Sequence, residues 1–589
     1  MTTRQARVRA PELTGLGGWL NTGGQVLTLQ DFRGSFLLLD FWTFCCVNCL
    51  HVLAELRPLE ERFGDVLTVV GVHSPKFAHE AEHANVVAAV QRYEVHHPVL
   101  DDPELSTWKQ YAVRAWPTLV LVDPEGYVVH VASGEGHAEG LGLLLEELTH
   151  EHDTKGTLKR GDGPYVPPPL AAGELAFPSK ALRLPDGTVL VSDSAHHSLV
   201  VLAGDEVTRR VGTGERGRAD GSDPTFAEPQ GLALLKDGSV LIADTANHLL
   251  RRLDLETGAV TTVAGTGQVW RPGDLTVGPA LEVNLSTPWD VTVWEGQVVV
   301  AMAGTHQLWA YDGTTVHVLA GTTGEGLRDG DATTAYLAQP SGLAAGTDRL
   351  WFADAETSAL RWLKDGEIGT AVGTGLFDFG HRDGPADQAL LQHPLGVTAL
   401  PDGSVAVSDT YNGAVRRYDP TTGLVTTLAT GLAEPSDVVV DGEHLLVVES
   451  AAHRVTRLRL PDEALTVDGD ALSTQRSVSD LALGPVTLTV VFTPPPGQRL
   501  DETYGPSTRV TVSASPPELL LQGVGVSTDL TRQLVLGGQG GVLHVAAMAA
   551  SCDVDSEHAA CHITQQDWGI PVRLVDGADK HLTLVLNGL

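Results

Sequence analysis

The stretch Asp40–Cys49 reads DFWTFCCVNC and holds three of the five cysteines in a chain of 589 residues. Apolar runs typical of buried strands flank it, SFLLLDFW at residues 35–42 and DVLTVVGVHS at residues 65–74. Between the cysteines and the second run, leucines recur at helical spacing at positions 50, 53, 56 and 59. The sequence therefore places the cysteines where a strand passes into a helix within a βαβ unit.

Cys46-Val47-Asn48-Cys49 is a C-x-x-C motif in a context that favours thiol chemistry. Unpaired backbone N–H groups at a helix N-terminus favour a thiolate, so Cys46 is the candidate nucleophile and Cys49 the resolving thiol. Two other interpretations stay open. Cysteines can act as small hydrophobes in a core, and three thiols with a fourth ligand such as His51 could bind zinc.

The second half of the region 1–150 continues the α/β pattern and contains a candidate cis proline. The segments 80–95 and 104–113 are expected to be helical, and Trp116-Pro117-Thr118 directly precedes the buried run LVLV. We expect a cis peptide bond at Pro117. His79–His83 matches H-E-x-x-H, but we expect two histidines on a solvated face of a connecting helix. The HEHD of His150–Asp153 is expected to be linker.

This first region resembles the thioredoxin superfamily, in particular its TlpA-like branch. DFWTFCCVNC aligns without a gap on the family pattern D-F-W-A-x-W-C-G-P-C, and WPT aligns on the cis-proline loop. The resemblance implies that Cys46 and Cys49 are catalytic, that Asp40 is a buried acid aiding proton transfer, and that Pro117 packs beside the disulfide. Trp116 and Thr118 are accessory candidates. Cys45 is a further one, because it stands where the family usually has tryptophan.

Residues 173–460 contain six copies of one pattern, of which EPQGLALLKDGSVLIADTANHLLRRL is representative. The proline that opens each copy is Pro178, Pro229, Pro288, Pro340, Pro394 or Pro435. Such a period indicates a propeller or solenoid, and alternation with D-G and N-H turns gives short hairpins. We expect four strands per copy in a six-bladed β-propeller, which resembles the NHL repeat family. Turn geometry explains the acids of GEGLRDGD and GHRDGPAD better than calcium or phosphate binding.

The tail, residues 461–589, is expected to form a small β-sandwich. Strand-like runs such as VTLTVVF and KHLTLVLNG alternate there with Pro/Gly turns. Cys552 and Cys561 flank the segment DVDSEHAA. They could form a disulfide, act as a second dithiol that exchanges with Cys46, or be unpaired core residues.

The net charge of the chain argues against some classes of binding partner. With 74 acidic and 39 basic residues the net charge is −35, which argues against nucleic acid or anionic membrane as the main partner. No run of about 18 apolar residues predicts a membrane span, and the N-terminal 20 residues lack the apolar core of a secretory signal. Few cysteines and no signal predict a cytoplasmic protein.

The predicted organisation is a thioredoxin-like domain (1–150), a linker (151–172), an NHL propeller (173–460) and a C-terminal sandwich-like domain (461–589). This order resembles the NHL repeat-containing protein 2 family. It implies a thiol–disulfide oxidoreductase acting on protein disulfides, with the propeller and tail selecting the partner and a cellular thiol as reductant. The alternative is a non-catalytic scaffold built on the propeller. No cofactor or metal is expected.

Overall fold

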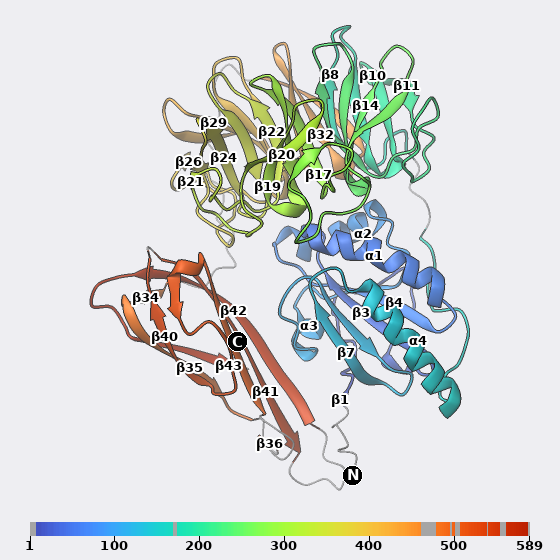
Figure 1. Ribbon diagram of the computed structural model, residues 1–589, viewed down its shortest axis with the longest axis vertical. Helices are drawn as coiled ribbons and strands as arrows, with labels where there is room; N and C mark the ends of the chain where they lie inside the picture. Colours follow the sequence, from blue (N-terminus) through green and yellow to red (C-terminus); the bar gives the residue numbers. More distant parts are fainter. Residues whose placement is uncertain are drawn as a thin grey trace. The chain divides into compact units, whose positions relative to one another are not determined.

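The computed structural model describes residues 8–168, 173–460, 479–494, 498–500, 507–538, 540–553 and 561–586 (Figure 1). The chain divides into two compact units, one of Met1–Pro169 with Gln475–Leu589 and one of Leu170–Thr474. Among the described residues, every helix is too short or too polar to cross a membrane.

The first region contains a seven-stranded mixed sheet in the order β1-β7-β6-β3-β4-β5-β2. Its strands are β1 (Val8–Arg9), β2 (Gly18–Leu20), β3 (Phe36–Trp42), β4 (Leu67–His73), β5 (Val99–Asp101), β6 (Thr118–Val122) and β7 (Tyr127–Ser133). Its helices are η1 (Leu29–Phe32), α1 (Val47–Phe63), η2 (His79–Ala81), α2 (His83–Arg92), α3 (Ser106–Gln110) and α4 (Ala138–Lys155). Strand β3 lies at the centre, parallel to β4 and antiparallel to β6.

Both faces of this sheet are covered, which explains why β3 is apolar along its whole length. Leu38 packs with Leu56 of α1 and Leu141 of α4, whereas Leu39 packs on the opposite face with Trp108 of α3. Because successive side chains of a strand point to opposite faces, an unbroken apolar run is what a central strand requires. The sheet thus fixes the end of β3, from which the cysteines follow.

Two local predictions in this region were wrong. His150–Asp153 is not linker, because α4 continues to Lys155 and buries His152. The H-E-x-x-H segment is not one helix, because η2 ends at Ala81 and α2 begins at His83. Its glutamate, Glu80, is fully buried. The segment therefore lacks the helical geometry of the zinc-protease motif and has one polar side chain in the core.

The second unit is a ring of six sheets, as the repeat predicts. The first blade consists of β8 (Pro178–Arg183), β9 (Val189–Asp193), β10 (Ser198–Ala203) and β11 (Glu206–Val211). The second consists of β12 (Pro229–Leu234), β13 (Val240–Asp244), β14 (Leu249–Leu253) and β15 (Val260–Ala264). The third consists of β17 (Pro288–Trp294), β18 (Gln297–Met302), β19 (Gln307–Tyr311) and β20 (Thr315–Ala320), with β16 (Val277–Pro279) at its edge. The fourth blade consists of β22 (Pro340–Ala345), β23 (Leu350–Asp354), β24 (Ala359–Lys364) and β25 (Glu367–Val372), with β21 (Gly330–Asp331) at its edge. The fifth consists of β27 (Gly396–Ala399), β28 (Val405–Asp409), β29 (Ala414–Asp419) and β30 (Leu424–Ala429), with β26 (Gly384–Pro385) at its edge. The sixth consists of β31 (Pro435–Asp441), β32 (His444–Glu449) and β33 (Arg454–Arg459). Innermost strands of successive blades contact one another, and β31 contacts β8 to close the ring. The sixth blade has three strands in the described part of the chain, one fewer than expected.

Buried ion pairs recur inside the blades. In the second blade Arg251 bonds Asp244 at 2.7 Å, and both side chains are fully buried. Arg361–Asp354 and Arg416–Asp409 repeat the pair in the fourth and fifth blades. In the third blade Met302 and Trp309 hold the corresponding register positions, and both are also buried.

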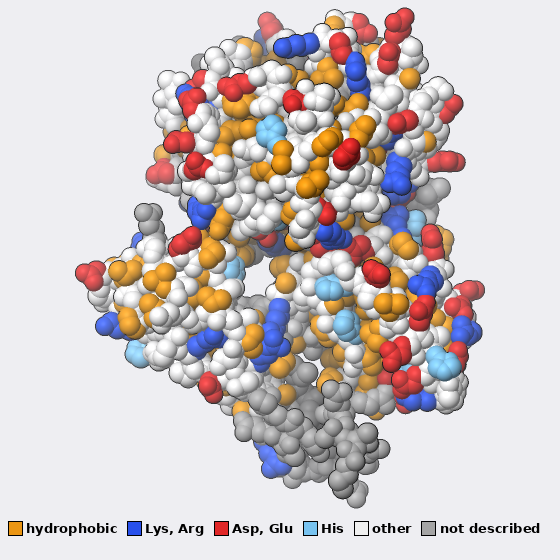
Figure 2. All heavy atoms as spheres, in the orientation of Figure 1, with side chains coloured by type: hydrophobic (Ala, Val, Ile, Leu, Met, Phe, Trp, Pro, Cys, Tyr) orange, Lys and Arg blue, Asp and Glu red, His pale blue; other side chains and the backbone are white. Residues whose placement is uncertain are grey.

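The acids noted in the repeat turns take part in these networks. Asp329 accepts Arg361 at 2.8 Å and the N–H of Thr370 at 2.9 Å. Asp383 likewise bonds Arg416 and accepts the N–H of Thr427. On the face of the propeller drawn in Figure 2, acidic and basic side chains are interspersed. Asp329 and Asp383, which hold the same position in their copies of the repeat, therefore have arginine and backbone partners.

A charged cluster joins blades across the centre of the ring. The Lys180 ammonium of the first blade lies 3.3 Å from Asp290 and 3.6 Å from Asp437, and it donates to the carbonyl of Leu395 at 2.8 Å. Asp437 also accepts the N–H of Ala181 at 3.0 Å. These contacts connect the innermost strands of the first, third and sixth blades, and the Leu395 carbonyl, directly before β27, adds the fifth.

The tail forms two packed sheets around one core, as predicted. One is β34-β42-β41-β37-β39, with β36 on β41, and the other is β38-β40-β35-β43. The strands are β34 (Ser479–Leu481), β35 (Gly484–Phe492), β36 (Gln498–Leu500), β37 (Thr508–Ser515), β38 (Leu520–Gln522), β39 (Gly525–Ser527), β40 (Thr531–Leu536), β41 (Gly541–Asp553), β42 (Cys561–Leu574) and β43 (His581–Leu586). Leu488, Val510 and Trp568 are buried in the shared core.

Candidate thiol site

The two cysteines of the C-x-x-C motif differ in exposure. Cys46 is the residue that caps the N-terminus of α1 and is half-buried, whereas Cys49 lies in the first turn and is completely buried. The carbonyl of Cys46 accepts the N–H groups of Cys49 and Leu50 at 3.0 and 3.2 Å. The structure therefore has one partly accessible thiol and one buried behind it.

The buried thiol is held in its protonated form. Burial raises the pKa of Cys49 well above its usual value, and a side-chain hydrogen bond with Cys46 raises it further. The negative charge of Asp40 acts in the same direction on the pKa of Cys49. Ionisation of Cys49 thus requires a nearby group that can take its proton.

Asp40 is the buried acid behind the thiols. It is fully buried on β3, and neither carboxylate oxygen has a hydrogen-bond partner among the described residues. Burial, with a smaller contribution from the charge of Glu60, raises the pKa of Asp40 to about 8. A carboxyl with this pKa can gain and lose a proton near neutral pH.

The peptide bond between Trp116 and Pro117 is cis, as expected. The Trp116 indole donates to the carbonyl of Ser74 at 2.8 Å, and its ring lies 4.5 Å from that of Trp108. The Thr118 hydroxyl donates to the carbonyl of Ala115 at 2.8 Å. Trp116 and Thr118 therefore fix the loop that carries Pro117.

Glu80 is a site residue that sequence reasoning missed. One carboxylate oxygen accepts the Thr43 hydroxyl at 2.7 Å and the Cys45 N–H at 2.9 Å. The other accepts the N–H groups of Lys76 and Phe77 at 2.9 and 3.0 Å. Burial raises the pKa of Glu80, against these hydrogen bonds, which lower it. The carboxylate ties the segment that precedes Cys46 to the loop after β4.

The remaining cysteines are placed as follows. Cys45 is buried beside the motif. Cys552 on β41 and Cys561 on β42 are directly opposite each other in the antiparallel register, and their side chains lie outside the described part of the structure. The backbone arrangement brings together the pair that the sequence separates by eight residues.

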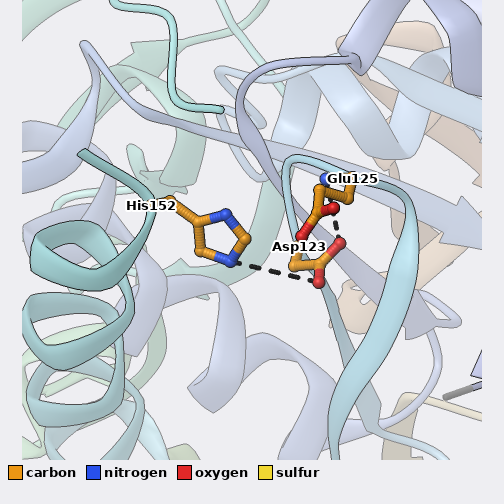
Figure 3. Close-up of side chains that lie close together, drawn as sticks. All are labelled: Asp123, Glu125 and His152. Carbon is orange, nitrogen blue, oxygen red and sulfur yellow. Dashed lines mark hydrogen bonds and ion pairs between the residues drawn. The ribbon is translucent and has the colours of Figure 1, made fainter. Parts of the chain in front are cut away.

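A second polar cluster lies at the turn between β6 and β7. Figure 3 shows Asp123, Glu125 and His152, whose ligand atoms lie within 4.8 Å of one another. Asp123 accepts the N–H of Glu125 at 2.9 Å, and His152 Nδ1 lies 2.7 Å from the hydroxyl of Thr157. These contacts fasten the turn and the end of α4, so a structural role accounts for the cluster. His51, the suggested zinc ligand, contacts Glu135 instead at 2.5 Å.

Comparison with known proteins supports both halves of this description. Residues 34–128 match the thioredoxin-like family, and residues 226–253 match the NHL repeat. The Bacillus subtilis thiol-disulfide oxidoreductase YkuV is 24% identical over 21% of this chain and 82% of its own length. The chain therefore has a thioredoxin-like domain related to thiol–disulfide oxidoreductases.

Longer similarities span several domains. Protein SUPPRESSOR OF QUENCHING 1, chloroplastic, from Arabidopsis thaliana is 36% identical over 76% of this chain, which spans only 45% of that relative. NHL repeat-containing protein 2 from Bos taurus is 34% identical over 82% of this chain and 74% of its own length. At this identity and coverage, the chain belongs to the NHL repeat-containing protein 2 family.

Proposed function

We propose that this chain is a thiol–disulfide oxidoreductase that acts on protein disulfides through Cys46 and Cys49. The observation that carries the proposal is the pairing of a half-exposed thiol at a helix N-terminus with a buried thiol hydrogen-bonded to it. Asp40, buried behind them, supplies a group that can exchange a proton near neutral pH. A scaffold needs none of these three features.

The proposed reaction has two steps. The Cys46 thiolate attacks one sulfur of a substrate disulfide, and the other substrate sulfur leaves as a thiolate that takes a proton from water. Cys49 then gives its proton to Asp40 and attacks Cys46, which releases the second substrate thiolate. Cys46 and Cys49 end as a disulfide, and the substrate gains two electrons as two thiols. A cellular thiol reductant restores the pair.

Other parts of the chain serve substrate binding in this proposal. Pro117 is buried next to Thr118 and shapes the groove beside Cys46. The propeller and the C-terminal sandwich select or position the protein partner. The blade interiors are stabilised by ion pairs of their own, so the outer loops are free to vary for recognition.

The reduction potential tests the proposal. The protein and its Cys45→Ala and Cys49→Ala variants are equilibrated with glutathione or dithiothreitol buffers, and their thiols are counted by mass. A reversible two-electron couple between about −120 and −300 mV, lost in Cys49→Ala, is expected for a working oxidoreductase. If no Cys46–Cys49 disulfide forms at any potential, the proposal fails and the propeller scaffold is favoured.

A further inference from the structure

Polar atoms without hydrogen-bond partners gather beneath the thiol site. In the described part of the chain these include both carboxylate oxygens of Asp40, the indole Nε1 of Trp42, Nε2 of His97 and both ring nitrogens of His73. Asp40 and Trp42 are fully buried, and His97 is 4% exposed. Buried polar groups in proteins are nearly always hydrogen-bonded, to protein or to ordered water. Several such atoms around one place therefore indicate a water site.

That place lies beside Gly71 on β4. Asp40 is the register partner of Gly71 in the parallel pair β3–β4, so their side-chain positions lie on the same face about 5 Å apart. Trp42 follows two residues after Asp40 and shares that face. A Cβ atom on Gly71 would lie 2.9 Å from Trp42 Nε1 and 3.2 Å from His97 Nε2. The unpartnered atoms of Trp42 and His97 thus converge beside Gly71, which lets them approach because it has no side chain.

His97 connects this space to the outside. Its Nδ1 lies 3.0 Å from a carboxylate oxygen of Glu60, whose side chain is 24% exposed. Because a carboxylate accepts hydrogen bonds, the imidazole proton lies on Nδ1, and Nε2 turns a lone pair towards Gly71. A proton can then enter at Nε2 while another leaves from Nδ1 to Glu60.

We propose that a water molecule held above Gly71 by Trp42 and His97 links Asp40 to the His97–Glu60 pair, and that Asp40 exchanges its proton with solvent by this path. The inference rests on the proposed function, since it assigns the exit of the proton that Cys49 gives to Asp40. One proton moves from Asp40 through the water to His97 Nε2, and the Nδ1 proton passes through Glu60 to solvent. No electrons move in this step. His97 is thereby a positioning and relay residue and not a catalytic one.

Titration of a coloured aromatic disulfide, 5,5′-dithiobis(2-nitrobenzoate), against the reduced full-length protein separates the two steps. Attack by Cys46 releases the first coloured thiolate, and attack by Cys49 releases the second. The Cys49→Ala variant identifies the second release, because it alone loses that phase. Rates are followed by stopped flow between pH 6 and 9. The ionisable side chains that face the path are Cys46, Cys49, Asp40, Glu60, His73 and His97.

The test variant is His97→Phe, and His96→Phe is its matched control. His97→Phe is expected to slow the second release about tenfold, which is a modest part of the rate enhancement that general acid–base catalysis contributes. The rate of the first release should stay unchanged. His96→Phe should change neither. In an Asp40→Asn background, which already lacks the acid, His97→Phe should cause no further slowing.

Other results would overturn the inference. Equal slowing by His97→Phe with and without Asp40 would assign His97 a purely structural role, and an unchanged second release would remove it from the path. If His97→Phe does not fold, Gly71→Ala, whose added methyl would push Trp42 Nε1 and His97 Nε2 away without changing charge, must slow the second release instead. Absence of a second release in the wild-type protein would overturn the proposed function itself.

Discussion

The Nδ1 atom of His453 accepts the backbone N–H of Phe177 at 3.0 Å, between residues 276 positions apart, and the two rings meet edge to face at 4.4 Å. This contact joins the sixth blade to the first. The same joint recurs between other neighbouring blades, where a histidine accepts an N–H from the residue before the next blade's first proline. The pairs are His197–Glu228, His248–Thr287 and His306–Gln339.

Replacing His453 should therefore weaken the ring at its closure. His453→Ala leaves the Phe177 N–H without its acceptor, a loss of about 1–3 kcal/mol in the free energy of unfolding. His453→Asn keeps an acceptor and tolerates the left-handed backbone at this residue (φ 55°), so it should lose less. His444→Ala is the control on the same blade. Urea unfolding followed by propeller tryptophan fluorescence gives the comparison, and equal effects of all three variants would contradict it.

Removing Lys180 should destabilise the propeller strongly. Lys180→Met leaves Asp290 and Asp437 as buried charges without their cation, at a cost of about 3–5 kcal/mol. Adding Asp290→Asn and Asp437→Asn should recover part of this loss. Exposed Lys236→Met is the control, and thermal unfolding is the measurement. A Lys180→Met variant as stable as the control would show that the central cluster is not a net source of stability.

Glu80 should control the order of the loop before Cys46. Glu80→Gln has one acceptor oxygen where the wild-type carboxylate has two, so amide hydrogens of Cys45, Lys76 and Phe77 should exchange faster. The loss of a buried charge-assisted network should lower stability by about 1–3 kcal/mol. Exposed Glu82→Gln is the control. Unchanged exchange at all three amides would show that the loops hold their positions without Glu80.

Asp40 should make stability depend on pH. The pKa of the carboxyl is about 8 in the folded protein, against 3.8 for an ordinary aspartate, so the folded state binds more protons between these values. Its contribution to stability is therefore lost as pH rises from about 4 to 8. Asp40→Asn removes this loss and should become more stable than wild type by up to roughly 5 kcal/mol at pH 8.5.

Hydrogen exchange of β3 amides, compared between wild type and Asp40→Asn at each pH, measures this effect locally. Protection should be similar at pH 4.5 and greater in Asp40→Asn at pH 8.5. A difference that stays constant with pH would contradict the raised pKa.

The parts predicted correctly from the sequence depend on local pattern. The strand before Cys46, the helix after it and the cis Pro117 follow from runs of neighbouring residues, and the six blades follow from repetition. Glu80 could not be found this way, because its partners Thr43 and Cys45 lie 37 and 35 residues away. Its place within an H-E-x-x-H match drew attention to zinc chemistry instead.

The same reason explains the other errors. Nothing in the HEHD sequence shows that His152 packs against Phe36, at 5.6 Å, and so extends α4. The opposition of Cys552 and Cys561 likewise requires the register of two long strands. Only the fold brings these residues together.

The apolar pair Met302–Trp309 in the third blade shows that the joints between blades are independent of the blade interiors. This blade has no Arg–Asp pair at that position, yet His306 still accepts the N–H of Gln339 at 3.2 Å. A buried ion pair can thus be exchanged for well-packed apolar side chains without altering how a blade meets its neighbour. The joint also varies on its own, since Ser358 takes the place of the histidine in the fourth blade and Gly413 in the fifth. The core of a blade and its joint can therefore change separately, which lets a ring of repeats evolve one member at a time.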